Sequence, residues 1–243
     1  MHRFRIAPED ASLGRARLSE EEKQHALKVL RLASGDPVEA TDGCGRAWEG
    51  VMDIDGEDAF ILLGAPKPST EAPVRLTVFM GIPKGEKLEL IAQKLTELGC
   101  ARLVPVRMER SVAKIAPGEA DKKLSRARRI SAEAIKQCGR QAEMEIADPI
   151  DFGILKKELP LCGRSFFMWE KASGDRLADF FEREPLLNDI GCVIGPEGGI
   201  SDKEAEALCA CGALPVTMGP RILRAETAAI AACAQIMTLW GDM

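Results

Sequence analysis

A glycine-rich loop is the segment of the sequence best suited to chemistry. Gly195-Pro196-Glu197-Gly198-Gly199 follows the apolar run 190–194 directly and leads into Ser201-Asp202-Lys203-Glu204. A serine and a glutamate at this spacing are typical of a capping box, so a helix is expected to begin there. Glycine lets the backbone approach a ligand closely, and open α/β sheets bind ligands in loops of this kind. The segment therefore predicts a ligand-binding loop, with an ordinary tight turn between strand and helix as the alternative.

A second loop, one strand and helix later, carries two arginines. It contains Gly219-Pro220-Arg221-Ile222-Leu223-Arg224, and Glu226 and Thr227 follow in the expected first turn of the next helix. In isolation, Glu226 would complement the helix dipole and Thr227 would cap the helix. However, the loops that follow parallel strands meet at one edge of the sheet. We therefore expect both loops to line one pocket.

Alternating strands and helices must position these loops. From about residue 74, β-rich runs alternate with runs whose apolar residues have helical spacing. Five such pairs predict a parallel α/β sheet with helices on both faces. The expected strands cover 74–80, 102–106, 165–169, 190–194 and 213–218, and the expected helices cover 88–98, 121–138, 175–184, 201–211 and 225–240.

The first 70 residues have a different pattern. Short β-rich runs at 37–40 and 47–52 flank a turn at 41–45, and one helix is expected at 20–32. The segment 64–73 contains three prolines, which oppose both helix and sheet, and it is expected to be a linker. The sequence thus predicts a small β-rich domain over 1–70 and a larger α/β domain over 74–243.

The composition excludes several classes of protein. With 46% hydrophobic and 29% charged residues, the chain is neither collagen-like, nor a disordered tail, nor a bundle of membrane spans. The longest uncharged run, 227–241, is too short to cross a bilayer, and no apolar signal segment opens the sequence. The eight cysteines form no CxxC pair, and the only histidines are His2 and His25. We expect free thiols, no metal site and a cytoplasmic protein.

Basic residues gather in one part of the chain although the formal net charge is −5. Residues 107–140 carry ten Lys or Arg against four Asp or Glu. Along the helix expected at 121–138, extended to 140, basic residues recur on one side and form a stripe. We expect this stripe to bind the phosphates of RNA, and an ordinary solvated helix face is the alternative. The stripe consists of Lys122, Arg126, Arg129, Lys136 and Arg140; Arg107, Arg110 and Lys114 flank it, and Arg3, Arg5, His25, Lys28 and Arg31 would extend the RNA surface in the small domain.

The two loops together resemble the RsmE family of 16S rRNA (uracil-N3) methyltransferases, of the SPOUT class. The resemblance covers nearly the whole chain. The chain departs from the family pattern at Ala225, where threonine is more frequent, and at Lys136, where an acidic residue is more usual. The further matches in the first 70 residues are His25, Val29-Leu30-Arg31 and Asp42-Gly43. Those in the rest of the chain are Lys84-Gly85 with Glu89, Lys94-Leu95-Thr96-Glu97-Leu98-Gly99, Glu109-Arg110-Ser111-Val112, and Glu133-Ala134 with Gln137 and Arg140.

The resemblance implies a fold and a set of ligands. It implies a small PUA-like β-barrel domain over 1–70 that binds RNA, followed over 74–243 by a SPOUT-type parallel sheet domain with a C-terminal trefoil knot. It implies a homodimer, S-adenosylmethionine as the cofactor, and a uridine near the 3′ end of 16S rRNA in the small ribosomal subunit as the substrate, with no metal and no membrane. The residues expected to bind the cofactor are Trp169, Glu170, Ile194, Gly195, Pro196, Glu197, Gly198, Gly199, Met218, Gly219, Ile222, Leu223, Ala225 and Thr227.

Methylation of uracil N3 requires the loss of an imide proton. The chain has no tyrosine, and neither histidine lies in the predicted α/β domain, so a histidine base is excluded there. Either a carboxylate such as Glu226 or Glu197 is the base, or Arg224 or Arg221 lowers the pKa of the uracil electrostatically. We favour the arginine mechanism with Glu226 positioning Arg224, and Glu226 as the base is the alternative.

Two other functions remain as alternatives at the level of the sequence. A non-catalytic RNA-binding protein could retain this fold, but it would not need the glycines of the first loop or the arginines of the second. An enzyme acting on a small molecule could use the same pocket, but it would not need the basic stripe.

Overall fold

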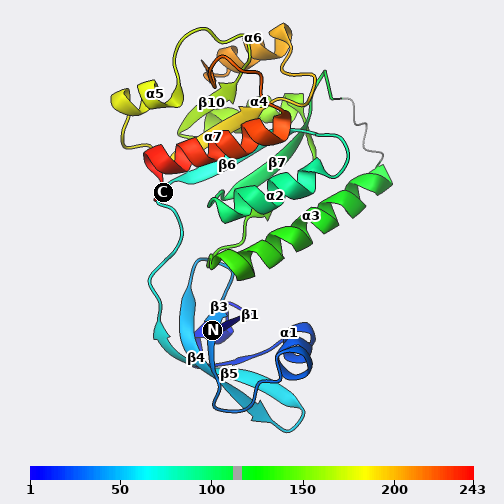
Figure 1. Cartoon of the computed structure of the whole chain (residues 1–243), viewed down its shortest axis with the longest axis vertical. Helices are drawn as coiled ribbons and strands as arrows, with labels where there is room; N and C mark the ends of the chain where they lie inside the picture. Colours follow the sequence, from blue (N-terminus) through cyan, green and yellow to red (C-terminus); the bar gives the residue numbers. More distant parts are fainter. Residues whose placement is uncertain (112–116) are drawn as a thin grey trace. The chain divides into compact units, whose positions relative to one another are not determined.

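The computed structural model describes residues 1–111 and 117–243, with the backbone alone described over 117–121. The chain forms two units: unit 1 comprises Met1–Glu71 and Ile135–Glu143, and unit 2 comprises Ala72–Ala134 and Met144–Met243 (Figure 1). The segment 135–143, which we expected in the larger domain, groups with unit 1. The reason is local: the carboxylate of Glu71 accepts hydrogen bonds from the backbone N–H groups of Gln141 and Ala142, at 2.7 and 2.9 Å.

Unit 1 is built on a five-stranded sheet with the strand order β1-β3-β4-β5-β2. β1 and β3 are parallel, and the other neighbours are antiparallel. The sheet buries an apolar cluster that includes Phe4, Val38, Met52 and Ile61. The predicted β-rich character is confirmed, but β5 continues to Pro66, inside the expected linker. The strands are β1 (His2–Arg5), β2 (Arg15–Arg17), β3 (Pro37–Thr41), β4 (Ala47–Asp55) and β5 (Asp58–Pro66), and a short 3-10 helix η1 covers Asp10–Ser12.

The helix expected at 20–32 is shorter and changes its winding. α1 (Glu20–Gln24) begins at Ser19, whose hydroxyl accepts the N–H of Glu22, and it continues as the π-helix η2 (His25–Val29). Arg31 then adopts a φ of 55°, in the left-handed region that non-glycine residues rarely occupy. This conformation ends the helix before Leu32.

Unit 2 contains a seven-stranded sheet in which all pairs are parallel. The strand order is β12-β10-β11-β6-β7-β8, with β9 also paired to β7. The strands are β6 (Arg75–Gly81), β7 (Arg102–Arg107), β8 (Glu145–Ile146), β9 (Ile150–Asp151), β10 (Arg164–Met168), β11 (Asp189–Ile194) and β12 (Leu214–Val216). The helices are α2 (Lys87–Glu97), α3 (Pro117–Cys138), α4 (Phe152–Glu158), α5 (Leu177–Arg183), α6 (Asp202–Ala210) and α7 (Ala225–Trp240), with a 3-10 turn η3 at Leu159–Leu161.

Helices cover both faces of this sheet, as predicted. Successive residues of a strand point to opposite faces, and in β6 Val78 and Met80 pack into the cluster formed with α2 and α7, whereas Phe79 packs with α4 and α6. α2 and α7 lie side by side on one face (Figure 1). The neighbouring strands β12, β10 and β11 end at the same edge, and the loops that follow them therefore come together there.

Candidate active site

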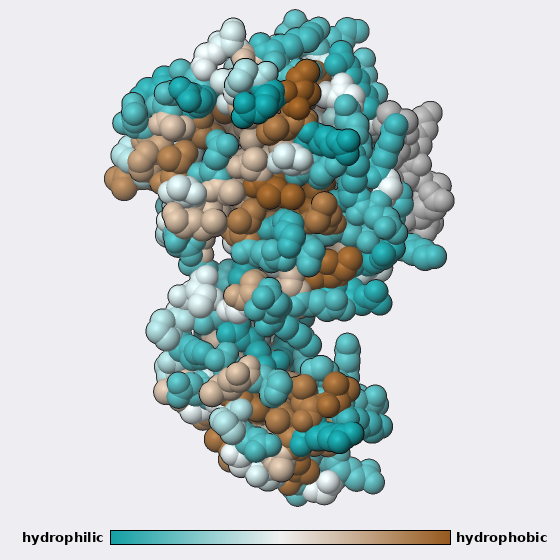
Figure 2. All heavy atoms as spheres, viewed as in Figure 1, coloured by the Kyte–Doolittle hydropathy of each residue, from teal (hydrophilic) through white to brown (hydrophobic). Residues whose placement is uncertain are grey.

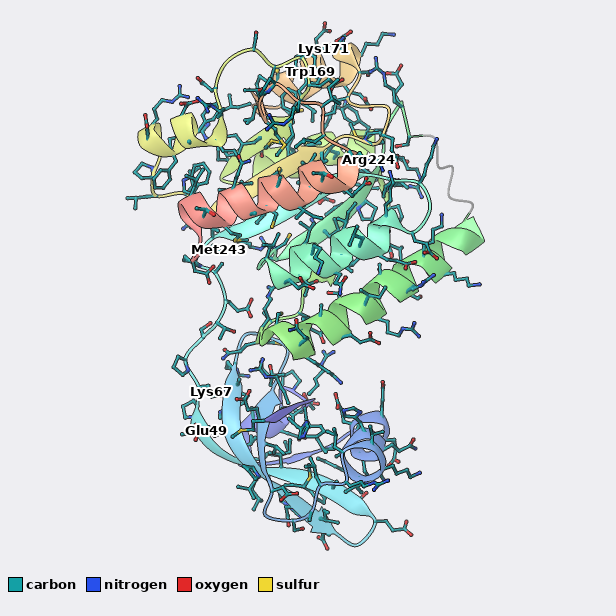
Figure 3. All side chains as sticks on the ribbon, viewed as in Figure 1. Glu49, Lys67, Trp169, Lys171, Arg224 and Met243 are labelled. Carbon is teal, nitrogen blue, oxygen red and sulfur yellow. The ribbon has the colours of Figure 1, made fainter. Side chains whose placement is uncertain are left out.

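A cavity of about 920 Å³ lies at the carboxyl ends of β10, β11 and β12. Its walls are the loop after β10, the glycine-rich loop after β11, the arginine loop after β12 and Lys87 of α2. Figure 3 shows Arg224 at the beginning of α7, with Trp169 and Lys171 after β10. The two loops selected from the sequence do line one cavity. All the residues expected to bind the cofactor line it except Thr227, which is exposed in the first turn of α7.

The glycines of the loop are required by close packing. A Cβ atom on Gly195 would lie 2.9 Å from Cγ1 of Ile200, and one on Gly198 would lie 2.8 Å from Cβ of Arg110. Gly199 has a φ of +73°, and a Cβ there would lie 2.8 Å from Oε1 of Glu170. The loop therefore leaves no room for larger residues and brings its backbone to the cavity wall.

The capping box predicted after this loop is confirmed. The Ser201 hydroxyl accepts the N–H of Glu204 at 3.3 Å, and the Glu204 carboxylate accepts the N–H of Ser201 at 3.0 Å. The segment after β7 braces the same corner: the Ser201 hydroxyl donates to Glu109 at 2.8 Å, and the N–H of Glu109 donates to Glu204 at 2.8 Å. These bonds fix the end of the glycine-rich loop.

Lys87 joins the glycine-rich loop to the first turn of α7, and the sequence did not predict it as a site residue. Its Nζ lies 3.0 Å from Oε1 of Glu197 and 3.1 Å from Oε2 of Glu226. Oε1 of Glu197 also accepts the backbone N–H of Lys84 at 3.0 Å. One signal in the sequence could have pointed to Lys87: a lysine in the first turn of a helix is disfavoured by the helix dipole, so it needs nearby carboxylates.

These three side chains hold one another in their charged forms. The hydrogen bond to Glu197 and the ion pair with Glu226 raise the pKa of the Lys87 ammonium. Burial opposes ionisation of Glu197, but the Lys84 N–H and the Lys87 ammonium outweigh it and lower the pKa of that carboxyl. The pKa of Glu226 is lowered by its own backbone N–H and then, against some desolvation, by Lys87. Glu226 is therefore an ionised carboxylate of reduced basicity.

The arginines at the cavity have a different environment. Arg221 and Arg224 are both exposed and line the cavity. In the part of the chain that the structure describes, no ion pair or side-chain hydrogen bond holds either guanidinium. Glu226, which we expected to position Arg224, binds Lys87 instead, and Arg224 affects it only through the longer-range lowering of its pKa. The positive charges of both arginines are thus available to a ligand.

The cavity fits the cofactor expected from the resemblance. Its volume lies within the range typical of small-molecule sites. The indole N–H of Trp169, in its wall, is buried and has no hydrogen-bond partner among the described residues. A buried donor of this kind is normally satisfied, so it is suited to a polar atom of a ligand. The glycine backbone provides further donors and acceptors at close range.

The structure places the members of the predicted basic stripe in different surroundings. α3 ends at Cys138, and Arg140 beyond it is only 6% exposed and donates to Glu71 at 2.7 Å. Arg126 binds Glu86 and Glu89 at 3.1 and 3.0 Å, and Lys136 binds Glu22 at 2.8 Å. Only Lys122 and Arg129 are exposed without an ion pair to another described residue.

The other basic residues expected to bind RNA fall into two groups. Arg3 is largely buried and bound to Glu39, and Arg5, Arg107 and Arg110 bind Glu143, Asp151 and the carbonyl of Gly198, respectively. In contrast, His25, Lys28 and Arg31 are exposed around the π-helix η2. Lys114 lies outside the described residues.

Over residues 1–111 and 117–243, no group of three or more His, Cys, Asp or Glu side chains is arranged to hold a metal ion. In the same part of the chain, no helix is long and apolar enough to cross a membrane. All eight cysteines lie among the described residues, and no disulfide joins any two of them.

Comparisons with known proteins agree with this geometry. The family of the RNA methyltransferase domain matches residues 70–237. Ribosomal RNA small subunit methyltransferase E of Synechocystis is 31% identical over 98% of this chain and 78% of its own length, and that of Bacillus subtilis is 30% identical over 89% and 87%. The crystal structure of ribosomal RNA small subunit methyltransferase E from Neisseria gonorrhoeae bound to S-adenosylmethionine has a TM-score of 0.85 and 29% identity, and covers 100% of this chain and 99% of that one. The chain belongs to the RsmE family of ribosomal RNA small subunit methyltransferases.

Proposed function

We propose that this protein transfers the methyl group of S-adenosylmethionine to N3 of a specific uridine near the 3′ end of 16S rRNA, within the small ribosomal subunit. The observation that carries the proposal is the cavity in which a glycine-rich backbone cradle faces two arginines that lack ion-pair partners among the described residues. The membership of the RsmE family and the cofactor bound to the Neisseria relative support it. Its site of action is then the cytoplasm, where ribosomal subunits are found.

The residues that would hold the cofactor come from three loops. The backbone of 195–199 and 218–223 and the indole N–H of Trp169 offer polar groups to it, and Glu170 lies against Gly199 in the same wall. When bound, S-adenosylmethionine supplies an electrophilic methyl group on a sulfonium centre.

The residues of the chain favour electrostatic activation of the uracil. A base must accept the N3 proton directly or through water, and Glu226 is poorly suited because Lys87 binds it and its pKa is lowered. A guanidinium beside the uracil stabilises the deprotonated ring and so lowers the pKa of its imide. Arg224 takes this role in our proposal, with Arg221 contributing at the opposite end of the same loop.

Two basic regions and an apolar surface support the remaining parts of the proposal. RNA contacts are assigned to Lys122, Arg129 and Arg110 in unit 2, and in unit 1 to the exposed group of His25, Lys28 and Arg31.

Figure 2 shows hydrophobic side chains gathered over α7 and α2 on one face of unit 2. Together with partly buried apolar residues of α7, this surface supports a homodimer.

The function is tested by transfer of labelled methyl from S-adenosylmethionine to small ribosomal subunits that lack the modification. Digestion and mass spectrometry of the nucleosides should identify N3-methyluridine, and subunits that already carry the modification should accept no label. Label on another atom or base would refute the assignment to N3. Binding of subunits by the folded protein without any transfer would favour a non-catalytic RNA-binding protein.

A further inference from the structure

Lys87 lies between two carboxylates that come from different segments of the chain, and of these only Glu197 lines the cavity. Glu197 lies in the glycine-rich loop, and Glu226 lies in the first turn of α7, two residues after Arg224. The side chain of Lys87 is 31% exposed, and those of Glu197 and Glu226 are 23% and 14% exposed. All three groups are thus partly withdrawn from solvent, where ion pairs are stronger than at an open surface.

Glu226 has two cations within electrostatic reach but contacts only one of them. Its Oε2 lies 3.1 Å from Nζ of Lys87, whereas Arg224 acts on it without an ion pair. Glu197 has a second donor, the backbone N–H of Lys84 at 3.0 Å, and therefore stays anchored without Lys87. Glu226 has no second side-chain donor among the described residues. Without Lys87, the remaining cation that acts on Glu226 is the guanidinium of Arg224.

We propose that Lys87 is a positioning residue for methyl transfer, which holds Glu226 and thereby leaves the Arg224 guanidinium unpaired for the uracil. The inference rests on the proposed function. In the absence of Lys87, Glu226 pairs with Arg224 and neutralises the charge that stabilises the deprotonated uracil. The effect is on the chemical step more than on the cofactor, because the glycine-rich loop keeps its bond to Lys84.

The test compares Lys87→Met, which keeps the aliphatic stem but removes the charge, with the double variant Lys87→Met/Glu226→Gln. Lys87→Met should lower kcat by about 10- to 100-fold, the loss expected when one stabilising charge is neutralised. Its affinity for S-adenosylmethionine, measured by calorimetry, should change by less than about threefold. The double variant should recover at least about tenfold of the lost kcat, because the competing carboxylate is gone. Lys87→Arg should also retain most of the activity.

Lys94→Met is the matched control. Lys94 lies in the same helix and pairs with Glu97 at 2.8 Å, but it does not line the cavity. Its removal should leave kcat unchanged. A kcat of Lys87→Met within twofold of wild type, or a double variant no faster than Lys87→Met, would overturn the proposal.

Crystal structures separate this inference from the proposed function. Lys87→Met should show the Glu226 carboxylate on the guanidinium of Arg224, and the double variant should show Arg224 unpaired. If the wild-type protein transfers no methyl group to small subunits, the proposed function fails, but these structures still decide the inference. A Glu226 side chain that turns to solvent in Lys87→Met would refute it.

Discussion

The arginines of the cavity and the cations of α3 were both predicted to meet a negatively charged ligand, but they have different surroundings. Arg221 and Arg224 are exposed and lack ion pairs within the described part of the chain, whereas Arg126 and Lys136 each meet carboxylates from other segments. Beside the cavity, Lys87 binds the carboxylates of Glu197 and Glu226. Charge at a functional site is therefore determined less by the number of cations than by which of them the acids neutralise.

The largest expected effect concerns Arg224. Arg224→Ala should lower kcat by about 100- to 1000-fold, because one preorganised charge at the reacting group is lost. Glu226→Gln should lower kcat by less than Arg224→Ala does. The affinity of Arg224→Ala for S-adenosylmethionine should remain close to that of wild type. Single-turnover methyl transfer measures both variants. Full turnover by Arg224→Ala, with loss of turnover in Glu226→Gln, would make Glu226 the base and reverse the assignment.

Arg140 should contribute to the stability of the folded protein, whereas Arg224 should contribute to its activity. Its side chain is 7% exposed and donates to Glu71 through Nε at 3.0 Å and through a terminal nitrogen at 2.7 Å. Arg140→Ala leaves the Glu71 carboxylate without its charge partner, and we expect a loss of about 3 kcal/mol in the free energy of unfolding. Chemical denaturation measures this loss. Unchanged stability combined with weaker binding of small subunits would return Arg140 to the RNA surface.

The cations of α3 that have ion-pair partners should contribute less to RNA binding than those that have none among the described residues. Lys122→Glu/Arg129→Glu should weaken binding to small subunits by about tenfold or more and reduce its salt dependence, because two phosphate contacts are lost. Arg126→Gln should have a smaller effect, since Glu86 and Glu89 already neutralise that guanidinium. Filter binding at two salt concentrations distinguishes the variants. Equal losses for the two would show that pairing with Glu86 and Glu89 does not withdraw Arg126 from RNA.

The smallest expected effect is on pH dependence. The pKa values of Glu197 and Glu226 lie below the ordinary 4.5, so their bonds to Lys87 persist at pH 4.5 and are lost only as the pH falls through the lowered values. These carboxyls therefore stabilise the folded protein above pH 4.5 and cease to do so on stronger acidification. In Lys87→Met the loss should begin at higher pH. Thermal stability measured from about pH 7 downward, with Lys94→Met as the control, gives this shift. An identical loss of stability with falling pH in Lys87→Met and wild type would contradict the prediction.

Features that depend on neighbouring residues were predictable from the sequence. The capping box at Ser201 was found because its two members are three residues apart, and α7 begins and ends where its apolar pattern does. The pocket followed from the rule that loops after parallel strands share one edge of the sheet.

Features that depend on distant partners were missed. Lys87 and Glu197 are 110 positions apart, and Arg140 and Glu71 are 69 positions apart, so no local pattern links them. β8 and β9 have two residues each, too few to show the alternation that marks a strand. The change from α-helical to π-helical winding at His25 likewise has no distinct pattern of apolar residues in the sequence. The trefoil knot stays a prediction of the resemblance.

The grouping of 135–143 with the first 71 residues has a consequence for protein engineering. The chain leaves unit 1 after Glu71, returns to it at Ile135 and leaves it again after Glu143. A single cut therefore cannot release unit 1 with all of its parts. Grafting this unit onto another scaffold would require two separate pieces of sequence. A gene fragment that ends at Glu71 would encode a unit that lacks Arg140, Gln141 and Ala142, which bind the Glu71 carboxylate.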